Sequence, residues 1–114
     1  MDGNEINGIY QISCGETVTI WSTRDSVPIG TVSIYYGDGC TSTLEVIVIF
    51  QTGEQHIFSV PQYNTRSRTL TNIVEVQLSC QNGTSPFPCT GQYCISIHHP
   101  IKNKQLALTP RSDS

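Results

Sequence analysis

Residues 92–98 read Gln92-Tyr93-Cys94-Ile95-Ser96-Ile97-His98, an alternation of apolar and polar side chains around one cysteine. Side chains of a β-strand point to opposite faces of the sheet in turn, so this alternation predicts a strand with one buried face. The apolar set is Tyr93, Ile95 and Ile97, which we expect to face the core. Cys94 belongs to the other set and is therefore expected on the outer face of the sheet.

The same period-two alternation recurs along most of the chain. It covers residues 17–21, 31–36 and 74–79, and no window of eleven or more residues has the apolar spacing of an amphipathic helix. Turn-forming residues separate the runs at intervals of about ten residues, and Thr52-Gly53 predicts a hairpin. We therefore predict an all-β fold, a single jelly-roll β-sandwich of seven or eight antiparallel strands.

The chain of 114 residues is long enough for one two-layer domain and too short for two. We predict a flexible N-terminal connector arm over residues 1–13, a jelly-roll domain over residues 14–99 and a flexible C-terminal tail over residues 100–114. The first residues contain no basic segment followed by an apolar one, so no signal peptide is expected. No stretch approaches the roughly 18 apolar residues that a membrane span requires.

Composition and spacing exclude several function classes. Charged residues make up 13% of the chain and the formal net charge is −3, so no basic surface for nucleic acid or an anionic membrane is expected. The sequence Gly37-Asp38-Gly39 precedes a strand pattern and not a helix, so it is not a phosphate-binding loop. A cysteine nucleophile would need a histidine base (His56, His98 or His99) and an orienting acid, and no local motif supports this, so we predict no enzymatic activity.

Four residues near the C-terminus, Cys89, Cys94, His98 and His99, have the chemistry of zinc ligands but not the spacing. Along a strand, Cys94 and His98 lie about 13 Å apart on one face and His99 points to the other. Zinc needs all its ligand atoms within roughly 2.0–2.3 Å of the metal. We therefore predict no metal site and no cofactor.

The chain contains five cysteines. Because this number is odd, at least one of them must be free or bonded to another chain. The outward-facing Cys94 is well placed for such a bond. Cys40 and Cys80 end strands and can pair with each other, or either can pair with Cys89, as internal disulfides worth about 2–4 kcal/mol each. The spacing does not fix this connectivity.

Apolar side chains outside the core pattern are expected to contact other subunits. Residues 44–50 are apolar on both faces, and the second face is covered either by the domain's own loops or by a neighbouring subunit. Residues 6–12 are expected to form an arm that reaches a neighbour. The expected subunit contacts are Ile6, Ile9, Tyr10, Ile12, Ile47 and Ile49.

Three strand-like segments and one longer stretch occur in a characteristic order. They are Ile12-Ser13-Cys14-Gly15-Glu16-Thr17-Val18, the apolar residues 44–50, Phe58-Ser59-Val60, and Thr90-Gly91-Gln92-Tyr93-Cys94-Ile95-Ser96-Ile97-His98. Over residues 12–99 this order resembles the endospore appendage (Ena-type) pilin family of spore-forming Bacillota. The last segment is similar to the family's C-terminal signature, Gly-x-aromatic-Cys-hydrophobic-x-hydrophobic.

The resemblance implies an eight-stranded jelly roll that stacks with its neighbours by β-sheet augmentation. It further implies that Cys14 and Cys94 accept disulfides from other subunits. Family subunits carry adjacent cysteines in the connector, whereas residues 1–13 contain none, so this chain has the acceptors without the usual donors. It is then a minor subunit at one end of a fibre, a ring-forming or anchoring relative, or a subunit that assembles by non-covalent contacts, and the sequence does not decide between a shaft and a terminal subunit.

The function implied by the resemblance is that of a structural subunit of a spore-surface appendage. Its partners would be further copies or related appendage subunits, together with spore coat or exosporium proteins. It would be made in the mother-cell cytoplasm and displayed on the spore. The alternatives are a carbohydrate- or surface-binding module with an aromatic platform of Trp21, Tyr35, Tyr36 and Tyr63, and a small redox or metal protein.

Overall fold

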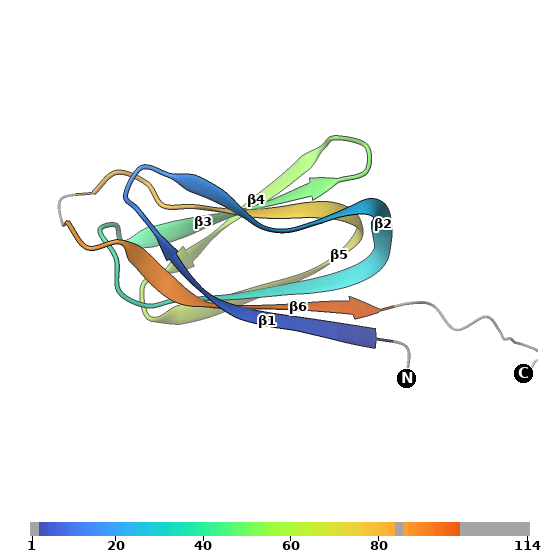
Figure 1. The fold of residues 1–114 in the computed structure, drawn as a ribbon, viewed down its shortest axis with the longest axis horizontal. Coiled ribbons are helices and arrows are strands. Elements are labelled where there is room, and N and C mark those ends of the chain that lie inside the picture. Colours follow the sequence, from blue (N-terminus) through green and yellow to red (C-terminus); the bar gives the residue numbers. More distant parts are fainter. Residues whose placement is uncertain (1–2, 84–85, 99–114) are drawn as a thin grey trace, which may run out of the picture.

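The structure, a computed structural model, describes residues 3–83 and 86–98. These residues form six β-strands and no helix: β1 (Gly3–Ile12), β2 (Thr17–Tyr36), β3 (Thr43–Phe50), β4 (Gln55–Pro61), β5 (Asn64–Ser79) and β6 (Cys89–His98). All pairs are antiparallel, and the strand order is β1-β6-β2-β5-β3-β4 (Figure 1). The predicted all-β class is confirmed. Within the described ranges, no helix is long and apolar enough to cross a membrane.

Two strands are long, which is why the described residues form six strands where seven or eight were expected. β2 has 20 residues and β5 has 16. The register between them shifts between Ser22 and Val27, and near the same point of β5, Asn72 has a φ of 58°. Such irregularities bend a strand without ending it. The residues at the bend of β2, numbers 22–26, are polar, and such a run predicts a turn between two strands as readily as a bend within one.

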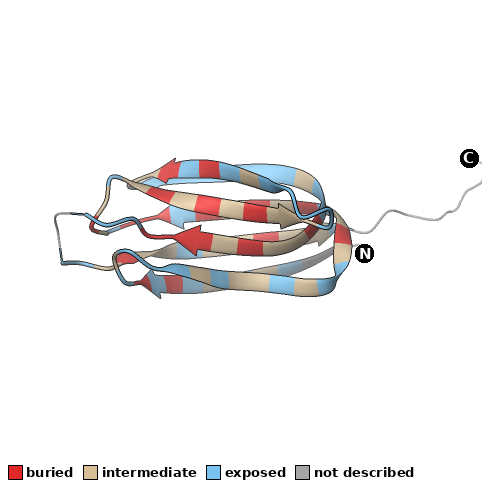
Figure 2. Cartoon of the chain, turned by 90° about the horizontal axis from the view of Figure 1, so that it is seen from above, coloured by how far each residue is buried: buried red, intermediate tan, exposed pale blue. Residues whose placement is uncertain are grey.

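The sheet folds back on itself at these bends. β1 and β4 are the outermost strands of the sheet, yet Tyr10 and Ile12 of β1 share one core cluster with Phe58 and Val60 of β4. Only a sheet whose two ends lie over each other can bring these side chains into one cluster (Figures 1 and 2). The guanidinium carbon of Arg68 on β5 also lies 4.8 Å from the centre of the Phe58 ring on β4, a cation–π contact between two strands that are not neighbours in the sheet.

Much of the core comes from the apolar sets that the alternation predicted, although Ile12 and Ile73 lie outside them. The largest fully buried side chains among the described residues are mostly β-branched or leucine: Tyr36, Ile12, Ile34, Leu44, Ile73, Leu78, Ile95, Val32, Val46, Val48, Val60 and Val76. Full burial of one such aliphatic side chain contributes about 1.5–3 kcal/mol. The turn between β3 and β4 lies where Thr52-Gly53 predicted a hairpin. There Gly53 has a φ of 93° and its N–H donates to the carbonyl of Phe50 at 2.8 Å.

Residues 3–12 form a strand of the sheet and not a free arm. β1 pairs with β6 over its whole length, from Gly3 opposite His98 to Ile12 opposite Cys89. Tyr10 is 7% exposed and Ile12 is 1% exposed. The prediction of a flexible connector is therefore wrong for these residues, because burying their apolar set stabilises the strand against β6. The predicted tail, residues 100–114, lies outside the described residues.

Two tyrosine–glycine pairs hold β1 in register with β6. Tyr10 lies opposite Gly91, and Tyr93 lies opposite Gly8. A Cβ on Gly91 would meet the Tyr10 ring and the carbonyl oxygen of Tyr35, and a Cβ on Gly8 would meet the Tyr93 ring. The Tyr10 hydroxyl donates a hydrogen bond to the carbonyl of Tyr35 at 2.8 Å. Each ring thus occupies the space that a side chain at the opposite glycine would take. Because a shifted register would place a larger residue opposite the ring, this arrangement fixes the register of β1 against β6.

The buried tyrosines predict alkaline destabilisation. Burial raises the pKa of both Tyr10 and Tyr36 above the usual value near 10. Above about pH 10 the unfolded chain loses these protons while the native state keeps them, so stability falls as pH rises, by about 1.4 kcal/mol per pH unit for each tyrosine. Urea denaturation from pH 7 to 11, in a Cys94→Ser background that prevents thiol exchange, measures this slope.

Tyr10→Phe is the control for this prediction. It removes the Tyr10 hydroxyl, whose pKa burial raises, so the slope above pH 10 is expected to become shallower. An unchanged slope in Tyr10→Phe would show that Tyr10 does not carry the effect.

Candidate assembly site

Cys94 lies on the outer face of β6 and is the one cysteine outside a disulfide among the residues that the structure describes. The next residue, Ile95, is 2% exposed and belongs to the core. This inward and outward alternation is the one that the sequence predicted for the strand, so the outward orientation of Cys94 is confirmed. Its bond to another chain stays a prediction.

The outer face around Cys94 consists mainly of hydroxyl and amide side chains. Asn7 of β1 and Ser33 of β2 lie directly opposite Cys94 on either side. Ser33 in turn pairs with Ser67 of β5, whose hydroxyl donates to the Ser33 hydroxyl at 2.9 Å. None of the four residues in this row, Asn7, Cys94, Ser33 and Ser67, is charged. A neighbouring polypeptide can therefore approach the thiol without desolvating an ion.

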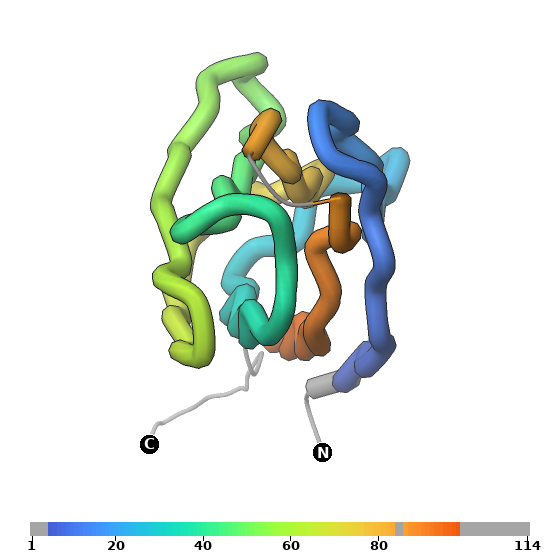
Figure 3. Tube along the Cα trace, turned by 90° about the vertical axis from the view of Figure 1, so that its left-hand side faces the viewer, coloured from blue at the N-terminus to red at the C-terminus, as the bar shows by residue number. Residues whose placement is uncertain are grey.

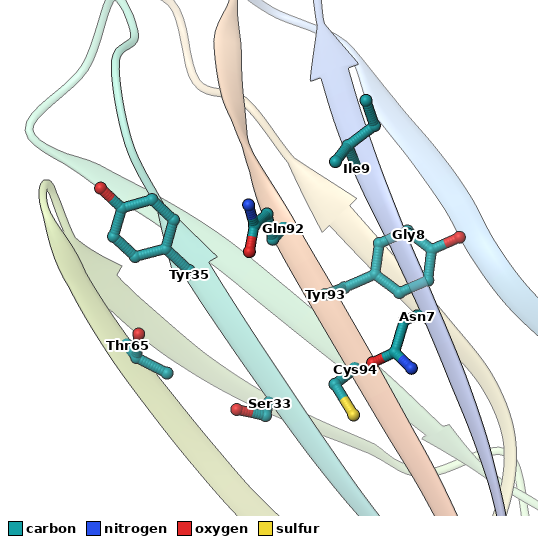
Figure 4. A pocket seen from close by; sticks show the side chains of 9 residues that line it. All are labelled: Asn7, Gly8, Ile9, Ser33, Tyr35, Thr65, Gln92, Tyr93 and Cys94. Atoms are coloured by element: carbon teal, nitrogen blue, oxygen red, sulfur yellow. The ribbon is translucent and has the colours of Figure 1, made fainter.

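A shallow hollow of about 590 Å³ lies over this row and includes the thiol. Its lining comes from β1, β6, β2 and β5: Asn7, Gly8, Ile9, Ser33, Tyr35, Thr65, Gln92, Tyr93 and Cys94 (Figure 4). In Figure 4 the Cys94 sulfur projects from β6 between Ser33 and Asn7. Ile9 and Tyr35 supply apolar surface at the other end of the hollow. The site therefore offers a reactive sulfur within a surface that can receive part of another chain.

The remaining four cysteines form two disulfides, Cys14–Cys40 and Cys80–Cys89. In this structure the Cys14 sulfur is bonded to Cys40 within the subunit, so the predicted bond of Cys14 to another subunit stays a prediction and would require this disulfide to open. Cys80–Cys89 is one of the internal pairings that the sequence left open. The turn holding Cys14 is brought to the loop of Cys80 by two backbone hydrogen bonds, Gly15 N–H to the Cys80 carbonyl at 2.6 Å and Cys80 N–H to the Glu16 carbonyl at 2.9 Å.

The six predicted contact residues divide between core and surface. Tyr10 and Ile12 are buried, so the prediction that they contact a neighbour is wrong; they face the core because their parity on β1 matches that of the inner set. Ile6 packs partly against the core. Ile9 is 81% exposed on the edge strand β1 and is free to contact another subunit.

A second apolar surface lies on the outer side of β3 and β4. Ile47 and Ile49 are half-buried, and Ile47 pairs with Ile57, which is 53% exposed. Sequence reasoning missed Ile57. The signal was present, since Ile57 falls out of phase with Phe58 and Val60, the inner set of the same strand.

The side chains considered for zinc are not brought together. Cys89 is buried in a disulfide, Cys94 has the opposite parity on β6, and His99 lies outside the described residues. A different group, the sulfurs of Cys14, Cys40 and Cys80, lies within 4.8 Å of one another. All three belong to disulfides.

The aromatic platform of the alternative hypothesis does not form as a unit. Tyr36 is fully buried, and its hydroxyl donates to the carbonyl of Thr41 at 2.6 Å. Trp21 lies in the half of β2 before the bend and packs partly against the core. Tyr35 and Tyr63 line a common hollow, and the Tyr63 hydroxyl donates to the Asp38 carboxylate at 2.7 Å.

Comparison with known proteins agrees with the predicted resemblance. The family model described as "Endospore appendages" matches residues 3–101. A solved Bacillus structure, reported as "Bacillus endospore appendages form a novel family of disulfide-linked pili", superposes with a TM-score of 0.71 at 14% identity and covers 88% of each chain. This likeness establishes the fold.

Two further comparisons add no argument. A structure of the infectious bursal disease virus Gx strain gives a TM-score of only 0.31 at 16% identity, over 90% of this chain and 31% of the viral chain. No curated protein matches the chain. With its family model matched over residues 3–101, the chain belongs to the endospore appendage family.

Proposed function

We propose that this chain is a non-enzymatic structural subunit of a spore-surface appendage. Neighbouring subunits are joined by pairing of sheet edges and by a disulfide through Cys94. The observation that carries the proposal is the Cys94 thiol, free of the two internal disulfides and set in an uncharged hollow on the outer face of the sheet. A surface cysteine that takes no part in the internal disulfides is well placed to cross-link. Its partners are further copies or related appendage subunits.

The strand pairing supports a jelly-roll description of the fold. Residues 27–36 of β2 and 64–73 of β5 extend the β1-β6 pair into one four-stranded layer. Residues 17–22 of β2 and 75–79 of β5 extend the β3-β4 pair into a second. Counted in this way, β2 and β5 each contribute two segments, which gives the eight that the family resemblance implies.

This arrangement leaves unpaired backbone on the outermost strands. Within residues 3–83 and 86–98, β1 pairs with β6 alone and β4 with β3 alone. An exposed edge is a template for a strand from another chain, and main-chain hydrogen bonds then supply affinity. Ile9 on β1 and Ile57 on β4 place apolar side chains at these two edges. Joining β1 of one subunit to β4 of the next is a heterologous contact, which generates a filament or a closed ring according to its rotation.

The edge contact predicts that Ile9→Lys weakens self-association. Burying an isoleucine side chain is worth about 1.5–3 kcal/mol, so the dissociation constant is expected to rise by about tenfold or more. Sedimentation of the Cys94→Ser protein with and without Ile9→Lys measures the non-covalent contact alone.

Gln11→Lys is the matched control, because Gln11 is exposed on the same strand and the same face. It adds the same charge without removing an apolar group. Equal weakening by Gln11→Lys and Ile9→Lys would mean that charge, and not burial of Ile9, is responsible.

Cys94→Ser is expected to abolish reducible multimers while leaving the fold intact. The side chain is only partly buried and makes no disulfide in the subunit, so serine replaces it at little cost. Wild-type protein should give reducible cross-linked species on non-reducing denaturing electrophoresis, at least a dimer joined through Cys94, that collapse to monomer on reduction, with filaments or rings by electron microscopy. Ser33→Ala, in the same row, is the control and should keep these species. Reducible species that persist in Cys94→Ser would refute the assigned role of Cys94.

A further inference from the structure

The two internal disulfides are in contact with each other. The Cys40 and Cys80 sulfurs are 3.6 Å apart, although they belong to different disulfides. Three loops meet at this end of the molecule, namely those between β1 and β2, β2 and β3, and β5 and β6 (Figure 3). Thiol–disulfide exchange requires a sulfur next to a disulfide sulfur, and the native packing already supplies this arrangement.

The four sulfur-bearing residues differ in exposure. Cys14 is half-buried, whereas Cys40 is 6% exposed and Cys80 and Cys89 are fully buried. A thiolate that arrives from solvent therefore meets the Cys14–Cys40 disulfide at Cys14. The Cys80–Cys89 disulfide is reached only from inside the protein, through Cys40.

We propose that the two disulfides form an exchange relay that accepts an incoming thiolate at Cys14. In the first step the thiolate R–S⁻ attacks the Cys14 sulfur, the Cys14–Cys40 bond breaks, and the electron pair leaves as the Cys40 thiolate. In the second step Cys40 attacks the Cys80 sulfur, a Cys40–Cys80 bond forms, and the Cys80–Cys89 bond breaks to release the Cys89 thiolate. One thiolate enters and one is released. The number of disulfides is two before and two after the exchange, so no oxidant is consumed.

One feature favours the second step. The Cys40 and Cys80 sulfurs are already in contact, so the attack is intramolecular and requires little reorganisation. The departing Cys89 sulfur lies 3.5 Å from the Tyr36 hydroxyl. That hydroxyl donates its one proton to the Thr41 carbonyl at 2.6 Å, so it donates to the Cys89 thiolate only after turning away from Thr41.

The relay supplies a second covalent attachment point, an inference that rests on the proposed function. One surface thiol per subunit joins subunits only in pairs, whereas a covalent chain needs two bonds per subunit. If Cys94 of a second copy is the incoming thiolate, each subunit donates through Cys94 and accepts at Cys14. The free thiol then moves from Cys94 to Cys89 and the total number of thiols stays constant.

Reaction of the full, oxidised Cys94→Ser chain with one equivalent of reduced glutathione tests the relay without any assembly. The reaction is quenched with acid, free thiols are alkylated, and peptic peptides are mapped by mass spectrometry without reduction. The expected products are glutathione on Cys14, a Cys40–Cys80 disulfide and an alkylated Cys89. Glutathione on Cys14 with an alkylated Cys40 and an intact Cys80–Cys89 bond would overturn the relay. So would attachment of glutathione to Cys80 or Cys89 with Cys14–Cys40 intact, or no reaction at all.

A second arm identifies the source of the thiolate during assembly. Wild-type protein is incubated without oxygen or added thiol, and multimers and free thiols are measured together. Multimers with one unchanged thiol per subunit, now at Cys89, are expected if a second copy supplies Cys94. Multimers that form only with oxidant, at the expense of thiols, would overturn this use of the relay while leaving Cys94 cross-linking itself in place. Absence of multimers under both conditions would instead contradict the proposed function.

Discussion

Removing the Cys14–Cys40 disulfide by Cys14→Ala/Cys40→Ala is expected to lower the free energy of unfolding by about 3.5 kcal/mol. The bond joins residues 26 positions apart, so its loss frees a long loop of the unfolded chain. It also releases the turn after β1 from the loop after β2, which holds the end of the core around Tyr36 and Leu44. Urea denaturation of the oxidised proteins measures the difference.

The second disulfide is the internal comparison. Cys80 and Cys89 are only 9 positions apart, and the same chain-entropy relation gives about 2.6 kcal/mol for Cys80→Ala/Cys89→Ala. The Cys14–Cys40 pair should therefore be the costlier loss by about 1 kcal/mol. If the shorter loop proves the more costly by a clear margin, packing of the buried sulfurs and not loop closure dominates at this end of the molecule.

Gly91→Ala is expected to destabilise the protein by about 2–3 kcal/mol, since inserting a methyl group into a filled core carries a cost of this size. Its Cβ would meet both the Tyr10 ring and the backbone carbonyl of Tyr35. The carbonyl belongs to β2, which is paired with β6, so it can move away only by disturbing the sheet. Displacement of Tyr10 would also break its hydrogen bond to that carbonyl. Thermal and urea unfolding measure the loss.

Gly8→Ala is the matched control for this steric argument. The Cβ at Gly8 would meet only the far end of the Tyr93 side chain, which is half-buried and can rotate away. Gly8→Ala should therefore be less costly than Gly91→Ala. Equal losses would indicate that the Tyr93 ring cannot move away, and that the backbone carbonyl beside Gly91 is not what makes that position the more costly one.

The face on which Cys94 lies could be predicted from sequence because it is a local property. Alternation within seven residues determines it, and the flanking strands do not change it. Cysteine pairing is different, since Cys14 meets Cys40 only after the loop between β1 and β2 and the loop between β2 and β3 have come together. No spacing rule records that meeting, which is why the sequence left the internal pairs open and did not predict the Cys14–Cys40 pair.

β1 shows a second limit of sequence reasoning. Its inner set is Ile6, Gly8, Tyr10 and Ile12, and the glycine interrupts the apolar period. The missing side chain is replaced in space by Tyr93 from the opposite strand, a compensation that only the structure reveals. The same is true of β2 and β5, whose bends contain polar residues that predict a turn as readily as a bulge.

The central claim is that Cys94 makes the covalent bond between subunits. The most direct measurement is disulfide mapping of purified, cross-linked multimers by mass spectrometry, with free thiols alkylated before digestion. The account predicts that every peptide pair joining two subunits contains Cys94, and that alkylated Cys94 comes only from free ends. Multimers joined through other cysteines, with Cys94 alkylated throughout, would contradict it.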